Sequence, residues 1–192
     1  MTRSPLPSAR RQELLELAYE YVLANGLTDL SLRPLASAIG SSPRVLLFLF
    51  GSKDGLVRAI LARAREEEVA LLQQVRAEGS GDLADVAAAV WRWLSAPERR
   101  RLLVLWSEGY VGSLVSPQGP WAGFAHDTVE DWLALLAGAQ PGRRRRSRDA
   151  AAERTLVLAV LRGALLDLLA TGDEQRTTAA VQRALAALPT SA

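Results

Sequence analysis

The sequence predicts an all-α protein, and three observations support this. Ala, Leu, Arg and Glu are abundant and β-branched residues are sparse, so the summed helix propensity is high. Apolar residues recur at spacings of three and four, and no stretch alternates with period two. Proline and glycine interrupt the pattern at intervals typical of helix lengths. We therefore expect about nine helices and no sheet.

The first helix is expected to begin after Pro7 and to end at Asn25-Gly26. Glutamates lie off its expected buried face. That face is formed by Leu14, Leu17, Ala18, Tyr21 and Val22.

Two short helices should follow, separated by a turn at Gly40. Ser31 can cap the first of them. Ser42 and Pro43 occupy the cap and first helical positions of the second, which we expect to end near Phe50. Two short helices across a tight glycine turn are typical of a helix-turn-helix.

A long connecting helix is expected from Lys53 to about Glu78, with Ser52 as its cap. Its apolar positions are Leu56, Ile60, Ala64, Leu71 and Val75. Further helices are expected at 82–95, 97–115, 120–138, 149–171 and 174–188. We place the boundary between an N-terminal domain, 1–55, and a C-terminal domain, 56–192.

Composition argues against several classes of protein. The chain of 192 residues has no cysteine and one histidine, so thiolate or imidazole metal clusters and a serine triad have too few residues. We expect no metal, no cofactor and no enzymatic activity. The N-terminus has no apolar core of signal-peptide length, and Arg162 and Asp167 interrupt the longest apolar run, so we expect a cytoplasmic protein without a membrane partner.

The stretch LSLRPLASAIGSSPRVLLFLFGSKDGL, residues 30–56, resembles the N-terminal domain of TetR-family transcriptional regulators. The resemblance covers about residues 10–61 and ends in Phe-x-Ser-Lys-x-x-Leu. It implies a three-helix DNA-binding domain, joined by the long helix to a C-terminal helical domain that binds an effector and dimerises. It also implies a dimer whose second short helices enter successive major grooves of a pseudo-palindromic operator.

The resemblance and the helix geometry together assign eight candidate DNA contacts. At about 100° per residue, the side of the second short helix opposite Leu46 would face DNA. Arg44 can donate to guanine, whereas the apolar positions can only contact groups such as thymine methyls. Ser31, Ser42 and Lys53 suit phosphates, and Arg33 is a second base or phosphate contact. The full set is Ser31, Arg33, Ser42, Arg44, Val45, Leu47, Phe48 and Lys53.

The sequence departs from the family at Leu47 and Leu49, where Tyr and His are common. Residues 45–50 are apolar without interruption, and a helix apolar on all sides is normally buried. The alternative is therefore a helical ligand-binding or partner-binding protein whose helix-turn-helix no longer contacts DNA.

All five tryptophans follow residue 82, and they suggest an aromatic effector pocket between helices. The same side chains could instead be ordinary core. The expected effector is a largely apolar or aromatic small molecule. The candidate residues are Trp91, Trp106, Tyr110, Trp121, Phe124, His126 and Trp132.

Three polar residues of this half leave alternatives open. His126, beside Asp127, is either a polar pocket group or a surface residue. Glu108 and Asp167 each lie among apolar neighbours and could orient a polar effector or mark the solvated edge of a helix.

The last two helices are predicted to form a homodimer interface of four helices, as in the family. Gly163 and Ala164 would let a partner helix approach closely. The candidate positions are Leu156, Val160, Gly163, Ala164, Leu168, Val181 and Leu185, with Leu188 beyond them. The arginines at 143–146 are expected to form a solvated loop, with extra DNA contact as the alternative.

Together these features predict a ligand-responsive regulator, a repressor that binds its operator as a dimer and that a small-molecule effector releases.

Overall fold

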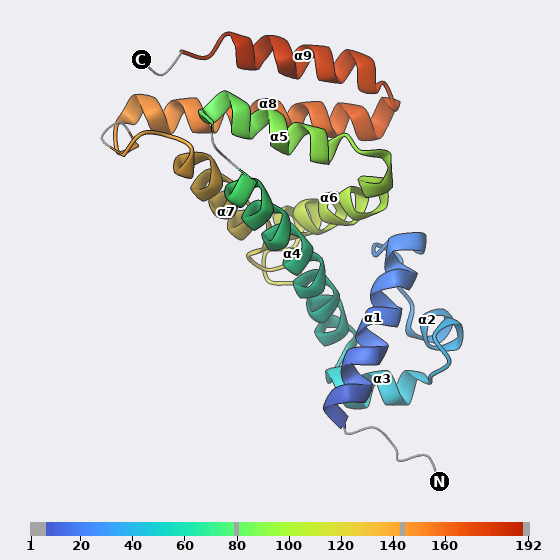
Figure 1. Ribbon diagram of the computed structural model, residues 1–192. Coiled ribbons are helices and arrows are strands. Elements are labelled where there is room, and N and C mark those ends of the chain that lie inside the picture. Colours follow the sequence, from blue (N-terminus) through green and yellow to red (C-terminus); the bar gives the residue numbers. More distant parts are fainter. Residues whose placement is uncertain (1–6, 79–80, 143–144, 190–192) are drawn as a thin grey trace. The chain divides into compact units, whose positions relative to one another are not determined.

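The computed structural model describes residues 7–78, 81–142 and 145–189 and confirms the all-α prediction. Within these ranges the chain forms nine α-helices and one 3-10 helix, and no strand is found there (Figure 1). The helices are α1 (Pro7–Asn25), α2 (Leu32–Ala38), α3 (Pro43–Phe50), α4 (Lys53–Glu78), α5 (Leu83–Leu94), η1 (Pro97–Arg99), α6 (Arg100–Val115), α7 (Phe124–Gly138), α8 (Arg148–Thr171) and α9 (Glu174–Ala186).

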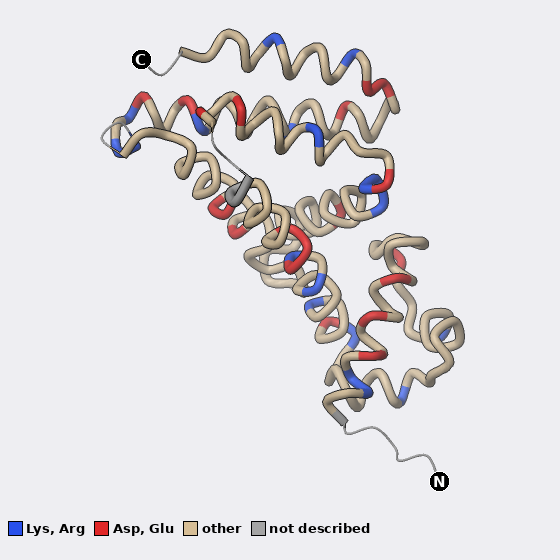
Figure 2. Tube along the Cα trace, in the orientation of Figure 1, with Lys and Arg blue, Asp and Glu red and all other residues tan. Residues whose placement is uncertain are grey.

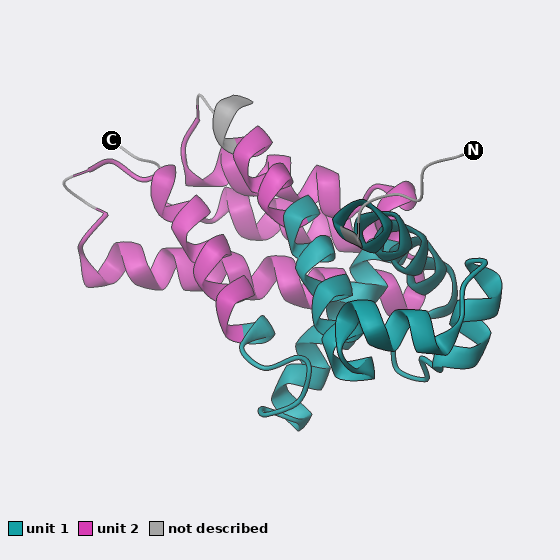
Figure 3. Ribbon diagram, turned by 90° about the horizontal axis from the view of Figure 1, so that it is seen from below, with its two compact units in different colours: residues 1–67, 101–125 teal, residues 68–100, 126–192 magenta. Residues whose placement is uncertain are grey.

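The chain forms two compact units, and neither is continuous in sequence (Figure 3). The first unit comprises residues 1–67 and 101–125, and the second comprises 68–100 and 126–192. The division falls within α4, and it assigns most of α6 to the same unit as α1 to α3. The expected boundary at residue 55 separates a DNA-binding from an effector-binding domain, whereas this division follows from packing. The expected boundary stays a prediction.

In the first unit α1, α2 and α3 pack on one another, and the buried face of α1 differs from the expected one. Leu14, Ala18 and Val22 are buried as predicted, but Leu17 is exposed. Leu15 and Tyr19 fill the core in its place. Both stripes have helical spacing, so the packing partners decide which one is buried.

In the second unit α5, α8 and α9 lie side by side (Figure 1). Asp82 and Asp85 form a capping box that satisfies the first amides of α5. Val90 of α5, Leu161 of α8 and Val181 of α9 are buried and contribute to the core of this unit.

Two helix boundaries differ from the prediction by more than two residues. The helix expected at 97–115 is divided into η1, which Pro97 opens, and α6. The helix expected from residue 120 begins only at Phe124, because residues 116–123 form turns that end at Gly123 with φ +79°. Trp121 therefore precedes α7 rather than lying within it.

Two of the four arginines at 143–146 lie in the described part of the chain. Arg145 donates from Nη2 to the Gly138 carbonyl at 3.2 Å, and its own carbonyl accepts from Nη1 of Arg154 at 3.0 Å. Arg145 thus connects the end of α7 to α8, while Arg146 is exposed. Arg143 and Arg144 lie outside the described residues.

The described ranges lack two features. None of the helices there is both long and apolar enough to cross a membrane. Among the same residues, no group of three or more His, Asp or Glu side chains could hold a metal ion.

Candidate functional site

Helices α2 and α3 form the helix-turn-helix that the sequence predicts. Gly40 has φ +64°, a conformation that other residues adopt only with strain, and it allows the chain to reverse between the helices. Ser42 is the N-cap of α3, and its hydroxyl accepts from the Val45 amide at 3.3 Å. Pro43 occupies the first turn, as expected. Local sequence signals therefore account for this turn.

Helix α3 buries one face and exposes the other. Leu46 and Phe50 are buried in the first unit, whereas Phe48 is 81% exposed. Val45 and Leu47 are also exposed, and the fourth residue predicted to face DNA, Arg44, shares their exposure. The uninterrupted apolar stretch is thus not buried on all sides in the protomer, and its exposed half is accessible to a partner.

Polar groups with hydrogen-bond donors lie on α2, on α3 and at the start of α4. Arg33 and Lys53 are exposed, and Arg44 is the one charged residue of α3 (Figure 2). Ser31 is the N-cap of α2, but its hydroxyl makes no capping hydrogen bond, so the expected side-chain cap is wrong. Ser52 does cap, accepting from the Gly55 amide at 2.9 Å. These groups can donate to phosphate oxygens.

Arg63 of α4 connects α4 to α1 within the first unit. Its Nε lies 3.1 and 3.0 Å from the two carboxylate oxygens of Glu16, and its Nη1 lies 3.2 Å from Glu67. Its guanidinium carbon also lies 4.8 Å from the centroid of the Tyr19 ring. Burial, followed by the charge of Glu67, raises the pKa of the Tyr19 hydroxyl, which stays neutral at physiological pH.

The seven predicted pocket residues divide between the two units. The first unit holds Trp106, Tyr110, Trp121 and Phe124. Trp106 and Phe124 are buried. The second unit holds Trp91, His126 and Trp132. Their joint pocket stays a prediction.

The three candidates of the second unit have different surroundings. Trp91 is buried, and its indole nitrogen donates to Thr178 Oγ1 at 2.9 Å. Trp132 is buried and donates to the carboxylate of Glu68, which is fully buried. His126 is exposed, with Nδ1 3.4 Å from Oδ1 of Asp127, which favours the surface alternative over the pocket one.

Glu68 was not singled out from the sequence. It lies in the run Glu66–Glu68, which has the composition of a solvated helix face. Only the packing of α4 shows that the third of these carboxylates is enclosed.

A cavity of about 190 Å³ lies in the second unit, but none of the predicted aromatic residues lines it. Asp82, Gln140, Glu153 and Leu185 are among its lining residues. Ligand pockets usually measure about 300–1,000 Å³, so this cavity is small for an effector.

The predicted dimer residues separate into an exposed set and a buried set. Leu156 is 55% exposed, and Gly163, about two turns further along α8, is also exposed. Leu168, Val181 and Leu185 are buried in the protomer's own core and offer no surface to a partner. Val160 and Ala164 are half-buried.

Six of the exposed positions of α8, all alanine, leucine or glycine, recur at spacings of three and four and form a stripe. We call it the α8 stripe, and its residues are Ala152, Leu156, Ala159, Gly163, Leu166 and Ala170. Leu166, which is 58% exposed, was missed. Its spacing of three from Gly163 was the available signal.

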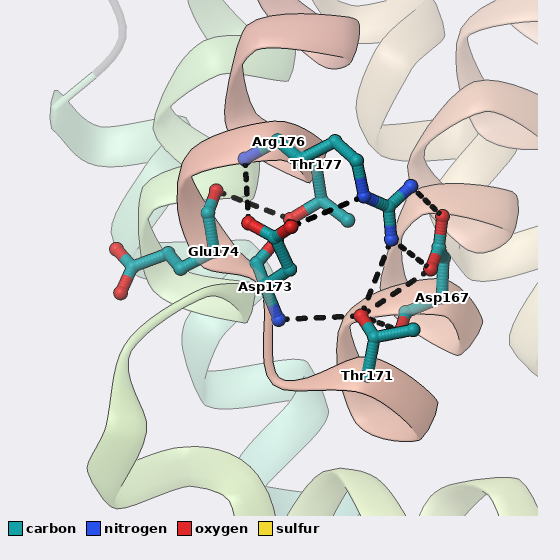
Figure 4. A network of polar contacts seen from close by, with 6 residues as sticks. All are labelled: Asp167, Thr171, Asp173, Glu174, Arg176 and Thr177. Carbon is teal, nitrogen blue, oxygen red and sulfur yellow. Dashed lines mark hydrogen bonds and ion pairs between the residues drawn. The ribbon is translucent and has the colours of Figure 1, made fainter.

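Asp167 forms an ion pair. The sequence suggested that it orients a polar effector or marks the solvated edge of its helix, and neither interpretation includes this pair. Its carboxylate accepts from Nη1 and Nη2 of Arg176 at 2.7 and 2.6 Å (Figure 4). Arg176 also bonds to Asp173, the N-cap of α9. The hydrogen bonds from Arg176 lower the pKa of Asp167. The cluster connects the end of α8 to the start of α9.

Solved structures with this fold are transcriptional regulators and a multidrug binding protein. A transcriptional regulator from Rhodococcus sp. Rha1 has a TM-score of 0.73 at 22% identity, over 92% of this chain and 94% of its own. A TetR regulator from Haloarcula marismortui has a TM-score of 0.73 at 18% identity, over 92% and 95%. The multidrug binding protein EbrR, complexed with proflavin, has a TM-score of 0.63 at 26% identity, over 91% and 99%.

These likenesses extend the predicted resemblance from the first 60 residues to nearly the whole chain. The chain has the fold of TetR-family transcriptional regulators, as predicted. A scan of family models and a search of curated proteins find no match.

Proposed function

We propose that this chain is a ligand-responsive transcriptional regulator that binds a pseudo-palindromic operator as a homodimer. The observation that carries the proposal is the exposed face of α3, with Arg44 in it and with Arg33 and Lys53 around it. A surface helix with donors near its N-terminal turn suits the major groove, where base edges and phosphates are within reach.

The eight candidate DNA contacts have distinct roles in this proposal. Arg44 and Arg33 donate to bases or phosphates, and the apolar positions contact thymine methyls. Ser31, Ser42 and Lys53 bind phosphates. In this proposal residues 1–55 form the DNA-binding domain. Residues 56–192 form the domain that binds the effector and dimerises.

We propose that the dimer forms through the α8 stripe and through exposed positions of α9. Leu156, Val160, Gly163 and Ala164 remain in this interface, whereas the three buried candidates support it from within the protomer. Two-fold symmetry of the protein then requires two similar half-sites in the DNA.

The effector is proposed to be a small, largely apolar or aromatic molecule that binds beside the predicted pocket residues of the first unit, Trp106, Tyr110, Trp121 and Phe124, and lowers DNA affinity. We further propose that the protein is a repressor. Because EbrR was crystallised with proflavin, that compound is a suitable first probe. The proposal assigns no catalysis and no cofactor, and it places the protein in the cytoplasm, where its DNA target is accessible.

Selection from a pool of random duplexes tests the proposal. We expect one two-fold-related sequence to be enriched and to bind with an affinity that falls steeply as salt rises, because phosphate contacts release counterions. Equal affinity for the enriched duplex and a random duplex would refute operator recognition.

One observation favours a second function. Phe48 is large, apolar and 81% exposed, which also suits a protein partner that covers α3. In that case no duplex is enriched, and Phe48→Ala abolishes partner binding without changing the weak affinity for DNA.

A further inference from the structure

Glu108 of α6 bonds to the turn between α1 and α2. Its Oε2 accepts from the Leu27 amide at 2.8 Å, and its Oε1 accepts from Thr28 Oγ1 at 3.1 Å. All three residues belong to the first unit. Hydrogen bonds to a charged group contribute more than neutral ones, so this carboxylate is a substantial tie between segments 80 residues apart.

The turn that Glu108 holds is compact and leads directly into the helix-turn-helix. Gly26 has φ +82°, and a Cβ there would lie 3.2 Å from Oε1 of Glu108. Leu27 and Leu30 are buried, and the Leu30 amide donates to the Leu27 carbonyl at 3.2 Å. Ser31, the N-cap of α2, is the next residue. The position of this turn therefore sets where α2 begins, and α3 packs on α2.

Helix α6, which carries Glu108, is in close contact with two aromatic residues. A Cβ on Gly109 would lie 3.1 Å from the Phe124 ring and 3.0 Å from Leu61, and a Cβ on Gly112 would lie 2.6 Å from the Trp121 ring. With glycine at both places, α6 packs its backbone directly on these side chains. A ring that moves toward α6 must displace the helix, since no free space separates them.

We propose that Glu108 is a positioning residue for DNA recognition: its carboxylate ties α6 to the turn before α2 and passes a displacement of α6 by Trp121 or Phe124 to α3. The proposal rests on the proposed function, because it concerns DNA affinity. It also provides a physical connection between two of the predicted pocket residues and the recognition helix, through contacts that all lie within the first unit.

The test compares Glu108→Ala with Glu130→Ala in the full chain. Glu130 is exposed on α7, so its substitution removes the same charge without touching the turn. We expect Glu108→Ala to weaken binding to the enriched duplex about tenfold, as the loss of a charged hydrogen-bond acceptor predicts. Glu130→Ala should stay within about twofold. Glu108→Gln retains an acceptor for the Leu27 amide and should fall between them.

A second measurement needs no DNA. Hydrogen exchange at the Leu27 amide should be faster in Glu108→Ala and in Trp121→Ala than in the wild type or Glu130→Ala, with helix content unchanged in each. Faster exchange in Trp121→Ala is the specific sign that the ring acts on the turn through α6. Unchanged exchange in that variant would overturn the transmission.

Failure of this inference differs from failure of the proposed function. If the wild type prefers no duplex, the proposed function fails, while exchange still reports whether Glu108 holds the turn. If the wild type binds the enriched duplex and folded Glu108→Ala binds it as tightly as Glu130→Ala, the role of Glu108 in DNA recognition is overturned.

Discussion

Two exposed apolar surfaces, the outer face of α3 and the α8 stripe, differ in side-chain size and in charge. Phe48 of α3 and Leu166 of α8 are both largely exposed. The α3 face has large side chains and a guanidinium, and the neighbouring elements add the exposed cations Arg33 on α2 and Lys53 at the start of α4. The α8 stripe has Gly163 at its centre, alanines on either side and no charged residue.

This difference is the reason for proposing different partners for the two surfaces. Cations near an apolar helix face favour an anionic polymer with apolar groups in its groove, which describes duplex DNA. Small residues in an uncharged stripe favour close approach of another helix, because the backbones can come near and bury the flanking leucines. Exposed area alone would not separate these cases. Four substitutions test the comparison, from the largest expected effect to the smallest.

Gly163→Trp should have the largest effect. A Cβ at Gly163 meets no atom within 4 Å, so the protomer accommodates the change, whereas a partner helix would be pushed away. We expect the dimer dissociation constant to rise by about 100-fold or more, equivalent to about 2.7 kcal/mol. Sedimentation checks it, with Gly138→Trp as control because Gly138 has equal space. An unchanged dimer would remove the α8 stripe from the interface.

Arg44→Ala should weaken binding to the enriched duplex by about 10- to 100-fold, the cost of one lost bidentate base contact. The control is Arg146→Ala, which removes the same charge from the exposed loop between α7 and α8. Titration with labelled duplex measures both. Equal losses of affinity in the two variants would mean one of two things. Either Arg44 attracts DNA only by long-range electrostatics, without a base contact, or the arginine loop also contacts DNA.

Phe48→Ala should have a smaller effect that depends on base identity. Thymine carries a C5 methyl that deoxyuridine lacks, and an apolar side chain loses that contact when uracil replaces thymine. We expect the wild type to bind a uracil-substituted duplex several-fold more weakly and Phe48→Ala to bind both duplexes equally, with the salt dependence unchanged. Equal sensitivity of both proteins to the substitution would exclude Phe48 from methyl contact.

Asp167→Asn should have the smallest effect. It removes the ion pair with Arg176 that connects α8, the helix of the α8 stripe, to α9, so we expect a small loss of stability. The Arg176 hydrogen bonds lower the pKa of Asp167 in the folded state, so the pair stabilises the fold above the ordinary carboxyl pKa and loses this contribution as pH falls through the lowered value. We expect a melting temperature about 1 °C lower than wild type at pH 7, because exposed pairs contribute little. The difference should begin to shrink as pH falls below about 4 and should disappear only below the lowered pKa of Asp167. Thermal unfolding across this range tests it, and a gap that persists in acid would contradict the assignment.

The features that depend on local sequence were predictable. Glycine turns, the Ser42 and Ser52 caps and proline positions act within a few residues, and they place α2, α3 and α4 correctly. The exposed face of α3 follows from the same periodicity, since Leu46 and Phe50 are its buried positions.

The tertiary structure decided which apolar faces are covered and by what. Periodicity identifies a stripe but not its partner, so it assigned Leu17 to the core and assigned Leu168 and Val181 to an interface, although both are buried within the protomer. It also could not assign Glu108, whose hydrogen-bond partner Thr28 is 80 residues away. Local propensities act over a few residues, whereas the partners of buried faces and carboxylates depend on contacts between distant segments of the chain.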